Sequence, residues 1–262
     1  EEDGRYVTES RLKKMLSHEV KLIEDRLGRV KHPNKMFFSY ANTVATIDFA
    51  KQFKGHGWVG IKYQIEPDED YNEIILHIRF KENDARLQQE TLGILGVNLI
   101  YGAFYKHNDP KKLLRYLYDH LDKDQIEIDT INFSGPRFAN VDNRLMSLQL
   151  VKNGMTDAVM FGPDGNNVLP ATILYRKNIL ALRGSFRPVT KVNMDMLTKG
   201  LDQFLHEPEV EKDQTIVISE LTLNALNDGG TIDEKDFLDR VDILCSLGQT
   251  VLISNFHEYF KL

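Results

Sequence analysis

The chain has 262 residues, 42% of them hydrophobic and 27% charged, so it is long enough to bury one large core or two ordinary ones. Its net charge of −6 gives no broad basic field, which argues against nucleic acid as the main partner and leaves room only for a local basic pocket. A single cysteine, Cys245, excludes an internal disulfide and favours a reduced, cytoplasmic setting.

The ends of the chain and its most apolar run indicate whether the protein enters a membrane and whether the sequence is part of a longer one. The opening residues EEDGRYVTES are acidic and polar, with neither a methionine nor a signal peptide, and the closing residues NFHEYFKL follow an apolar run. The run LGILGVNLIYGAF at 92–104 is too short and too glycine-rich to cross a bilayer. We therefore expect no membrane partner, and we expect a piece of a longer protein.

The first half predicts a helix-rich lobe with one β-hairpin. An apolar stripe indicates a helix over 8–30, and alternating residues over 57–80 indicate a hairpin with its turn at 67–70. Two more helices are expected, one over 85–104, whose glycines allow close approach of another backbone, and one over 110–122.

The second half alternates strands and helices, which is typical of an α/β lobe. The strand QIEIDTINF is followed by a helix in VDNRLMSLQLVKN, a strand in DAVMF, two strands around Lys177 and Asn178, and a helix in NMDMLTKGLDQFL. The predicted class is therefore α/β, with a mixed α+β lobe over 1–125 and an α/β lobe over 126–262, truncated at its C-terminus. We place the boundary near 123–128.

The last stretch has the clearest pattern. The apolar runs TIVISEL and QTVLISNF flank a helix near 233–246, so we predict neighbouring parallel strands joined by a right-handed crossover. Ligands of such sheets lie beyond the carboxyl ends of the strands, here near Ser219, Glu220, Ser254 and Asn255. Capping of the strand ends by the same side chains is the alternative.

The segment ILALRGSFRPVT at 179–190 is typical of a strand that enters a phosphate-binding turn. Backbone N–H groups and a helix N-terminus hold phosphate oxygens at such turns, and an arginine clamps a phosphate through two donors. The candidate ligand-binding residues are Arg183, Ser185, Arg187, Thr190 and Lys191. We predict that Arg183 and Arg187 share one anion site; an ordinary strand end is the alternative.

This segment resembles the signature of the nucleotidyltransferase superfamily that makes dinucleotide cofactors. Gly184, Phe186, Pro188 and Thr190 match it, whereas a valine and an asparagine, at 192 and 193, stand where that family has a glycine and a histidine. The histidine stabilises charge on the transferred phosphoryl group, and asparagine supplies no cation. We therefore predict that this chain does not make a dinucleotide from nicotinate mononucleotide and ATP.

Longer runs resemble an uncharacterised family of bacterial proteins that often carry the label nicotinate-nucleotide adenylyltransferase. The runs are HGWVGIKYQ, QQETLGILGVNLIYGAFY, FSGPRFANVDNRLMSLQLVKNGMTDAVMFGPDG, RGSFRPVTKVNMDML and TVLISNF. The resemblance covers most of 36–262 and implies little chemistry. Members are longer than this chain, which agrees with the expectation of a fragment.

Two polar clusters are further candidates. Asp142, Asn143 and Arg144 follow a strand at the start of a helix, where α/β proteins place ligands; a helix cap with a solvated arginine is the alternative. In FGPDGNN, Asp164 is a candidate oxygen ligand for Mg²⁺ or Ca²⁺, and a tight β-turn is the alternative.

The predicted hairpin carries His56, Trp58, His77 and Arg79, a set that suits an aromatic or anionic ligand or plain partial exposure. The histidines show no HxxxH repeat and there is no Cys/His cluster, so a zinc site has no support.

The functional expectation is an enzyme or former enzyme, nucleotidyltransferase-like, that binds a phosphorylated small molecule or nucleotide near 183–191, the nucleotide with Mg²⁺. No catalytic residue is identified. The alternative is a non-catalytic homo-oligomeric assembly or regulatory protein that self-associates through the helix at 92–104 and the hairpin. An exposed apolar segment would favour the alternative, and a basic concave pocket would favour ligand binding.

Overall fold

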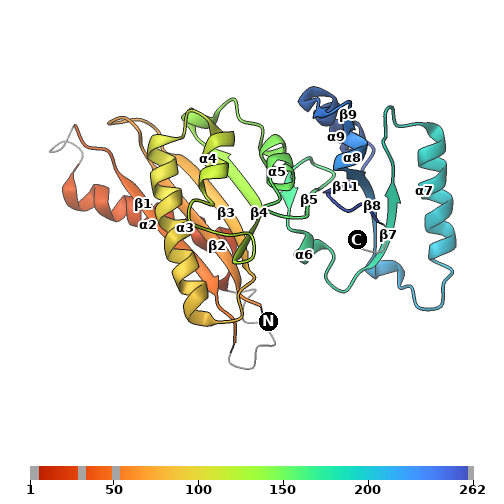
Figure 1. Cartoon of the computed structure of the whole chain (residues 1–262), viewed down its shortest axis with the longest axis horizontal. Coiled ribbons are helices and arrows are strands. Elements are labelled where there is room, and N and C mark those ends of the chain that lie inside the picture. The colour runs from red at the N-terminus through yellow and green to blue at the C-terminus, as the bar shows by residue number, and fades with distance from the viewer. Residues whose placement is uncertain (1–5, 29–33, 49–53, 259–262) are drawn as a thin grey trace. The chain divides into compact units, whose positions relative to one another are not determined.

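A computed structural model describes residues 6–28, 34–48 and 54–258 of the chain (Figure 1). It divides into two compact units, Glu1–Met146 and Ser147–Leu262. Helices and two main sheets make up the structure, which confirms the predicted α/β class. Within the described ranges, no helix is long and apolar enough to span a membrane.

Unit 1 is built on a four-stranded antiparallel sheet whose strands lie in chain order. They are β1 (Phe38–Ala45), β2 (His56–Tyr63), β3 (Asn72–Phe80) and β4 (Ile126–Ser134). β2 and β3 pair continuously from His56 opposite Arg79 to Tyr63 opposite Asn72, so the predicted hairpin is confirmed. The register of β3 with β4 shifts once, between His77 and Ile78.

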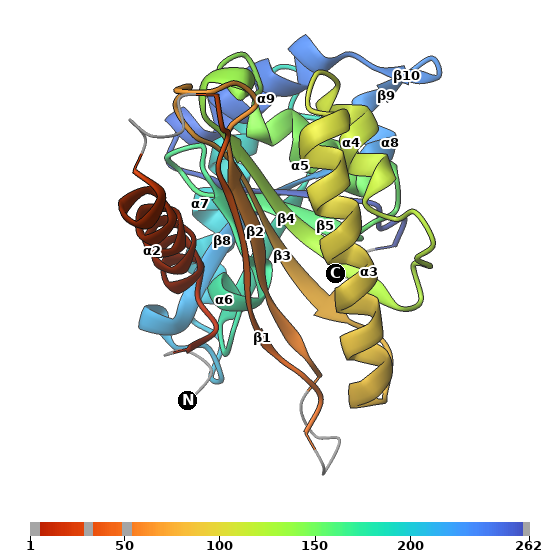
Figure 2. The same ribbon diagram turned by 90° about the vertical axis from the view of Figure 1, so that its left-hand side faces the viewer.

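Helices cover both faces of this sheet (Figure 2). α2 (Glu9–Leu27) is capped by Thr8 and buries one apolar face against β1 and β2. The absence of a side chain at Gly60 lets α2 lie close to β2. A Cβ on Gly60 would come within 3.0 Å of Leu12 and 3.1 Å of Leu16. α3 (Ala85–Tyr105) lies against the other face and packs on α4 (Pro110–Tyr116).

The core of unit 1 follows from alternation along the strands. Alternate residues in the middle of β2 and β3 are large apolar side chains that are fully buried, and α3 adds two leucines. These residues are Val59, Ile61, Ile74, Leu76, Ile78, Leu95 and Leu99.

Unit 2 is built on a five-stranded sheet in the order β6-β5-β11-β8-β7. β7 (Asn178–Arg183), β8 (Thr215–Thr222) and β11 (Thr250–Ser254) are parallel, and β5 (Ala158–Phe161) pairs antiparallel with β11 and with β6 (Asn167–Val168). β8 and β11 are neighbours connected through α9 (Glu234–Ser246), so the predicted parallel pair is confirmed.

The remaining elements are short apart from two helices. They are α5 (Asn143–Lys152), α6 (Pro170–Ile173), α7 (Lys191–Phe204), α8 (Leu223–Leu226) and the strands β9 (Asn227–Asp228) and β10 (Thr231–Ile232).

The structure differs from the sequence-based expectation in several places. The helix expected over 110–122 ends at Tyr116. The boundary between the units along the chain falls after Met146 rather than near 123–128, because β4 pairs with β3 in the first sheet. Residues 170–173 form the helical turn α6 instead of a strand, with Pro170 in its first turn, where a missing N–H costs nothing. β1 is an additional strand that the periodicity of the sequence did not predict.

We predict that Gly57→Ala destabilises unit 1, because its Cβ would lie 2.6 Å from the Thr43 carbonyl oxygen and from the Val44 Cα on β1. Overpacking of this kind costs about 1–3 kcal/mol. Urea unfolding followed by Trp58 fluorescence measures the change. The matched control is Gly200→Ala in α7, where a Cβ makes only an ordinary contact at 3.9 Å and helix propensity improves. Equal stability of the two variants would contradict the prediction.

Candidate functional sites

A buried ion pair lies at the carboxyl edge of the parallel strands of unit 2. The register sets Arg183 at the end of β7 opposite Glu220 of β8, whose side chain is fully buried. The guanidinium donates to Glu220 from Nε (2.7 Å) and Nη2 (2.9 Å), and the Ser254 hydroxyl donates to the same carboxylate (2.5 Å). Such bidentate geometry, with a further hydrogen bond to the carboxylate, offsets part of the desolvation cost of a buried ion pair.

This pairing defines the role of Arg183 in the structure. Its third nitrogen, Nη1, donates to the carbonyl of His257 (3.3 Å), so each guanidinium nitrogen has a protein acceptor. Of the other residues expected at this edge, Ser219 has a buried hydroxyl without a hydrogen-bond partner among the described residues, and the backbone N–H of Asn255 donates to Asp157.

A second charged cluster joins the 184–190 loop to α9. Arg187 lies 3.3 Å from Asp236, and the same carboxylate pairs with Arg240, which is buried. Arg240 also donates to the carbonyls of Ser185 (2.9 Å) and Ala225 (3.0 Å). Arg183 and Arg187 therefore bind two different carboxylates, and their shared anion site stays a prediction. The partners in α9 were missed because a four-residue Asp–Arg spacing is typical of ordinary surface pairs.

Thr190 and Asn193 form a capping box at the start of α7. The Thr190 hydroxyl accepts from the backbone N–H of Asn193 (3.3 Å), and the Asn193 side-chain oxygen accepts from the backbone N–H of Thr190 (2.8 Å). Lys191 follows as the first helical residue and is exposed. Asn193, at the position where the nucleotidyltransferase signature has a histidine, therefore has a structural role in capping α7.

The cluster before α5 is held together by its own bonds. The Asn143 side chain bonds both backbone groups of Phe133, at 2.8 and 3.0 Å, and so extends the edge of β4. Asp142 accepts from Nε (3.1 Å) and Nη2 (2.8 Å) of Arg144. Burial alone would raise the pKa of Asp142, but the hydrogen bonds and charge of Arg144 outweigh it and lower the pKa.

Asp164 shapes the turn between β5 and β6. Its two carboxylate oxygens accept from the side-chain nitrogen (2.7 Å) and the backbone N–H (3.1 Å) of Asn166, and these bonds lower the pKa of Asp164. Over the part of the chain that the structure describes, no three or more His, Cys, Asp or Glu side chains are grouped to hold a metal ion. The turn alternative accounts for Asp164.

Two histidines of the hairpin and an aspartate of β4 lie within hydrogen-bond distance of one another in sequence, with His77 in the middle. Nδ1 of His77 lies 2.7 Å from Asp129, and Nε2 of His77 lies 3.2 Å from Nδ1 of His56. The Trp58 ring meets His77 edge-on, with centroids 4.9 Å apart. Arg79 is exposed. Sequence patterns missed Asp129, because it is the unpaired residue at the register shift between β3 and β4, beside Thr130, which lies opposite His77.

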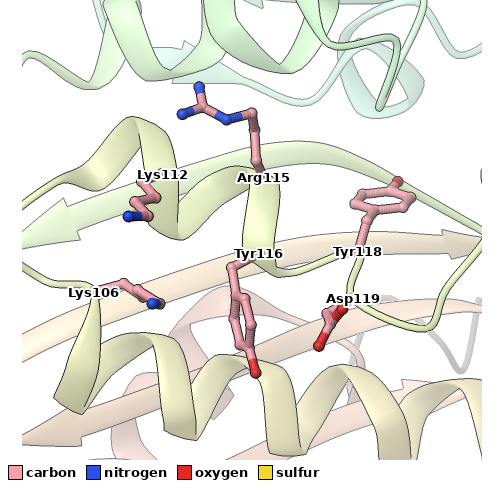
Figure 3. Close-up of a pocket in the computed structure, with 6 residues that line it drawn as sticks. All are labelled: Lys106, Lys112, Arg115, Tyr116, Tyr118 and Asp119. Carbon is pink, nitrogen blue, oxygen red and sulfur yellow. The ribbon is translucent and has the colours of Figure 1, made fainter.

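The basic pocket of unit 1 is an open surface depression of about 420 Å³. Its lining residues follow α3 or belong to α4 and the turn after it: Lys106, Lys112, Arg115, Tyr116, Tyr118 and Asp119. Figure 3 shows Tyr116 turned toward α3 and Arg115 pointing the opposite way, with Lys106 and Lys112 on the same side of the view. Lys106 lies over the rings of Tyr101 (5.8 Å) and Tyr116 (5.7 Å). No ion pair joins any of the three cations to another described residue.

The pocket is rigidly framed. Asn98, buried on α3, donates to the carbonyls of Leu117 (3.0 Å) and Asp119 (2.7 Å). The Tyr118 hydroxyl donates to the Ile126 carbonyl (3.0 Å), which ties the turn to β4. No sequence pattern indicates this pocket, because its cations have the spacing of ordinary solvated residues and come together only where the fold brings the end of α3 to α4.

Comparison with known proteins found no matching family model, no matching curated protein and no matching solved structure.

We predict that Glu220→Gln destabilises unit 2 by about 3–5 kcal/mol, because removing one partner leaves the charge of Arg183 largely desolvated and uncompensated. Hydrogen exchange at β8 during urea unfolding reports the change. Asp195→Asn is the control: its pair with Lys199 is exposed, so we expect a change below about 1 kcal/mol. A stable Glu220→Gln variant would show that the buried pair contributes little.

Proposed function

We propose that this chain binds a phosphorylated small molecule, and that the basic pocket of unit 1 is its site. The observation that carries the proposal is the charge of the pocket: three cations against one carboxylate, Asp119, in a chain whose net charge is negative. Anions concentrate where such an excess of positive charge lies at a surface depression.

Size and chemistry support a phosphate ester. Ligand pockets span about 300–1,000 Å³, and the basic pocket, at about 420 Å³, suits a molecule of nucleotide size. Arg115 and Lys112 supply donors for phosphate oxygens. Tyr116 and Tyr118 supply apolar ring surface for the rest of the ligand. The frame provided by Asn98 lowers the ordering cost of binding.

The segment at 183–191 is the second candidate for the same ligand class. Arg187, with a side chain half exposed, and Lys191 lie at the N-terminal end of α7, where partial positive charge favours anions. An anion there competes with Asp236 for Arg187, which is why we rank the basic pocket first. A cytoplasmic location is part of the proposal, since the one cysteine is buried and free.

Binding of AMP, inorganic phosphate and adenosine, measured by calorimetry, tests the proposal. We expect AMP to bind better than phosphate, and adenosine, which lacks the charge, to bind weakest. The double variant Lys112→Gln/Arg115→Gln should lose about tenfold or more in AMP affinity, since a charge-assisted hydrogen bond contributes about 1.5–3 kcal/mol.

Two further variants make the result decisive. Lys199→Gln removes an exposed cation of α7 and should change nothing. Arg187→Gln/Lys191→Gln tests the other segment. Loss of affinity in that variant alone would move the site to 183–191, and absence of phosphate-dependent binding in the unmodified chain would contradict the function itself.

We also predict no pyrophosphate release with nicotinate mononucleotide and ATP. Asn193 supplies no cation, and its side-chain oxygen is engaged with Thr190. A coupled pyrophosphate assay checks this. Release that Thr190→Ala abolishes, while Thr198→Ala on the same helix leaves it intact, would contradict the prediction.

A further inference from the structure

The outer face of α3 is an apolar stripe, defined as Leu87, Ile94, Val97, Tyr101 and Tyr105. All five side chains are exposed, Val97 by 66% and Tyr105 by 70%. They recur at helical spacing along one face of a helix whose residues 91–105 include no charged side chain. A contiguous exposed apolar surface of this kind marks an interaction site.

Gly93 lies within the same face and is in open space among the described residues. A Cβ added to it would meet nothing within 4 Å, whereas one added to Gly96 would come within 2.6 Å of the Tyr40 hydroxyl. Glycine in a helix interior costs about 1 kcal/mol relative to alanine, so an exposed one calls for a contact outside the described fold. A ring or backbone from a partner fits the space that Gly93 leaves open.

The charges at the two ends of the stripe identify the partner as a second copy. Glu90 lies one turn before Gly93, and Lys106 directly follows Tyr105. An antiparallel α3–α3 pair centred at Val97 brings Glu90 near Lys106 of the other copy, since they lie about 10.5 and 13.5 Å from the centre at 1.5 Å per residue. It also places Gly93 against the ring of Tyr101. A parallel pair would oppose like charges at both ends.

We propose that the chain forms a two-fold homodimer through the α3 stripe, with Val97 near the axis. Each contact occurs twice, as a closed two-fold interface requires. Glu90 can pair with Lys106 of the other copy, because its ion pair with Arg86 is long (3.5 Å) and highly exposed. Lys112 and Arg115 belong to α4 and lie outside the stripe, whereas Lys106 lines the basic pocket and also takes part in the proposed contact.

Sedimentation equilibrium of the full chain over a range of concentrations tests the dimer. We expect twice the chain mass of 30.2 kDa, and Val97→Glu should yield monomer with an unchanged circular dichroism spectrum. Ile243→Glu, a change at an exposed apolar residue of α9, should leave the dimer intact. A monomer at every concentration, or a dimer indifferent to Val97→Glu, would overturn the proposal.

A charge swap tests the register. Glu90→Lys and Lys106→Glu should each raise the dissociation constant by about tenfold, and the double variant should recover it, because opposite charges then meet again. Gly93→Ala should weaken the dimer while raising the stability of the monomer. A double variant no better than the single ones would overturn the antiparallel arrangement.

Discussion

A buried asparagine fixes the part of unit 1 on which both proposals depend. Asn98 gives two hydrogen bonds to the carbonyls of Leu117 and Asp119, so the turn after α4 is tied to the middle of α3. Buried polar groups need such partners, and Asn98 must therefore face inward together with the leucines beside it. One consequence is that Val97 and Tyr101 face outward. The second consequence is that Lys106, at the end of α3, lies beside α4 and lines the basic pocket.

The candidate anion-binding cations are paired with carboxylates in unit 2 and are not so paired among the described residues of unit 1. In unit 2, Arg183 lies against buried Glu220 and Arg187 lies against Asp236, so an incoming anion would have to replace a carboxylate. In the basic pocket of unit 1, Lys112 and Arg115 are exposed and make no ion pair with described residues. An anion that enters the pocket displaces water alone, which costs less than breaking a formed pair.

Sequence periodicity predicts the long regular elements, such as α2, the β2–β3 hairpin and the β8–α9–β11 unit, because each buries one continuous apolar pattern. β1 escapes it because polar residues such as Asn42 and Thr43 interrupt the alternation, and pairing with β2 compensates for them. The sites are harder to predict. Individual residues such as Arg183 stand out in the sequence, but their partners are set by strand register and helix packing, which no local pattern encodes.

Mapping the ligand onto the chain by two-dimensional ¹H–¹⁵N NMR tests the central claim most directly. Titration with AMP should shift the amide signals of the basic pocket, over residues 106–119, and leave those of 183–191 in place. Shifts confined to 183–191, or no saturable shifts at all, would contradict the account.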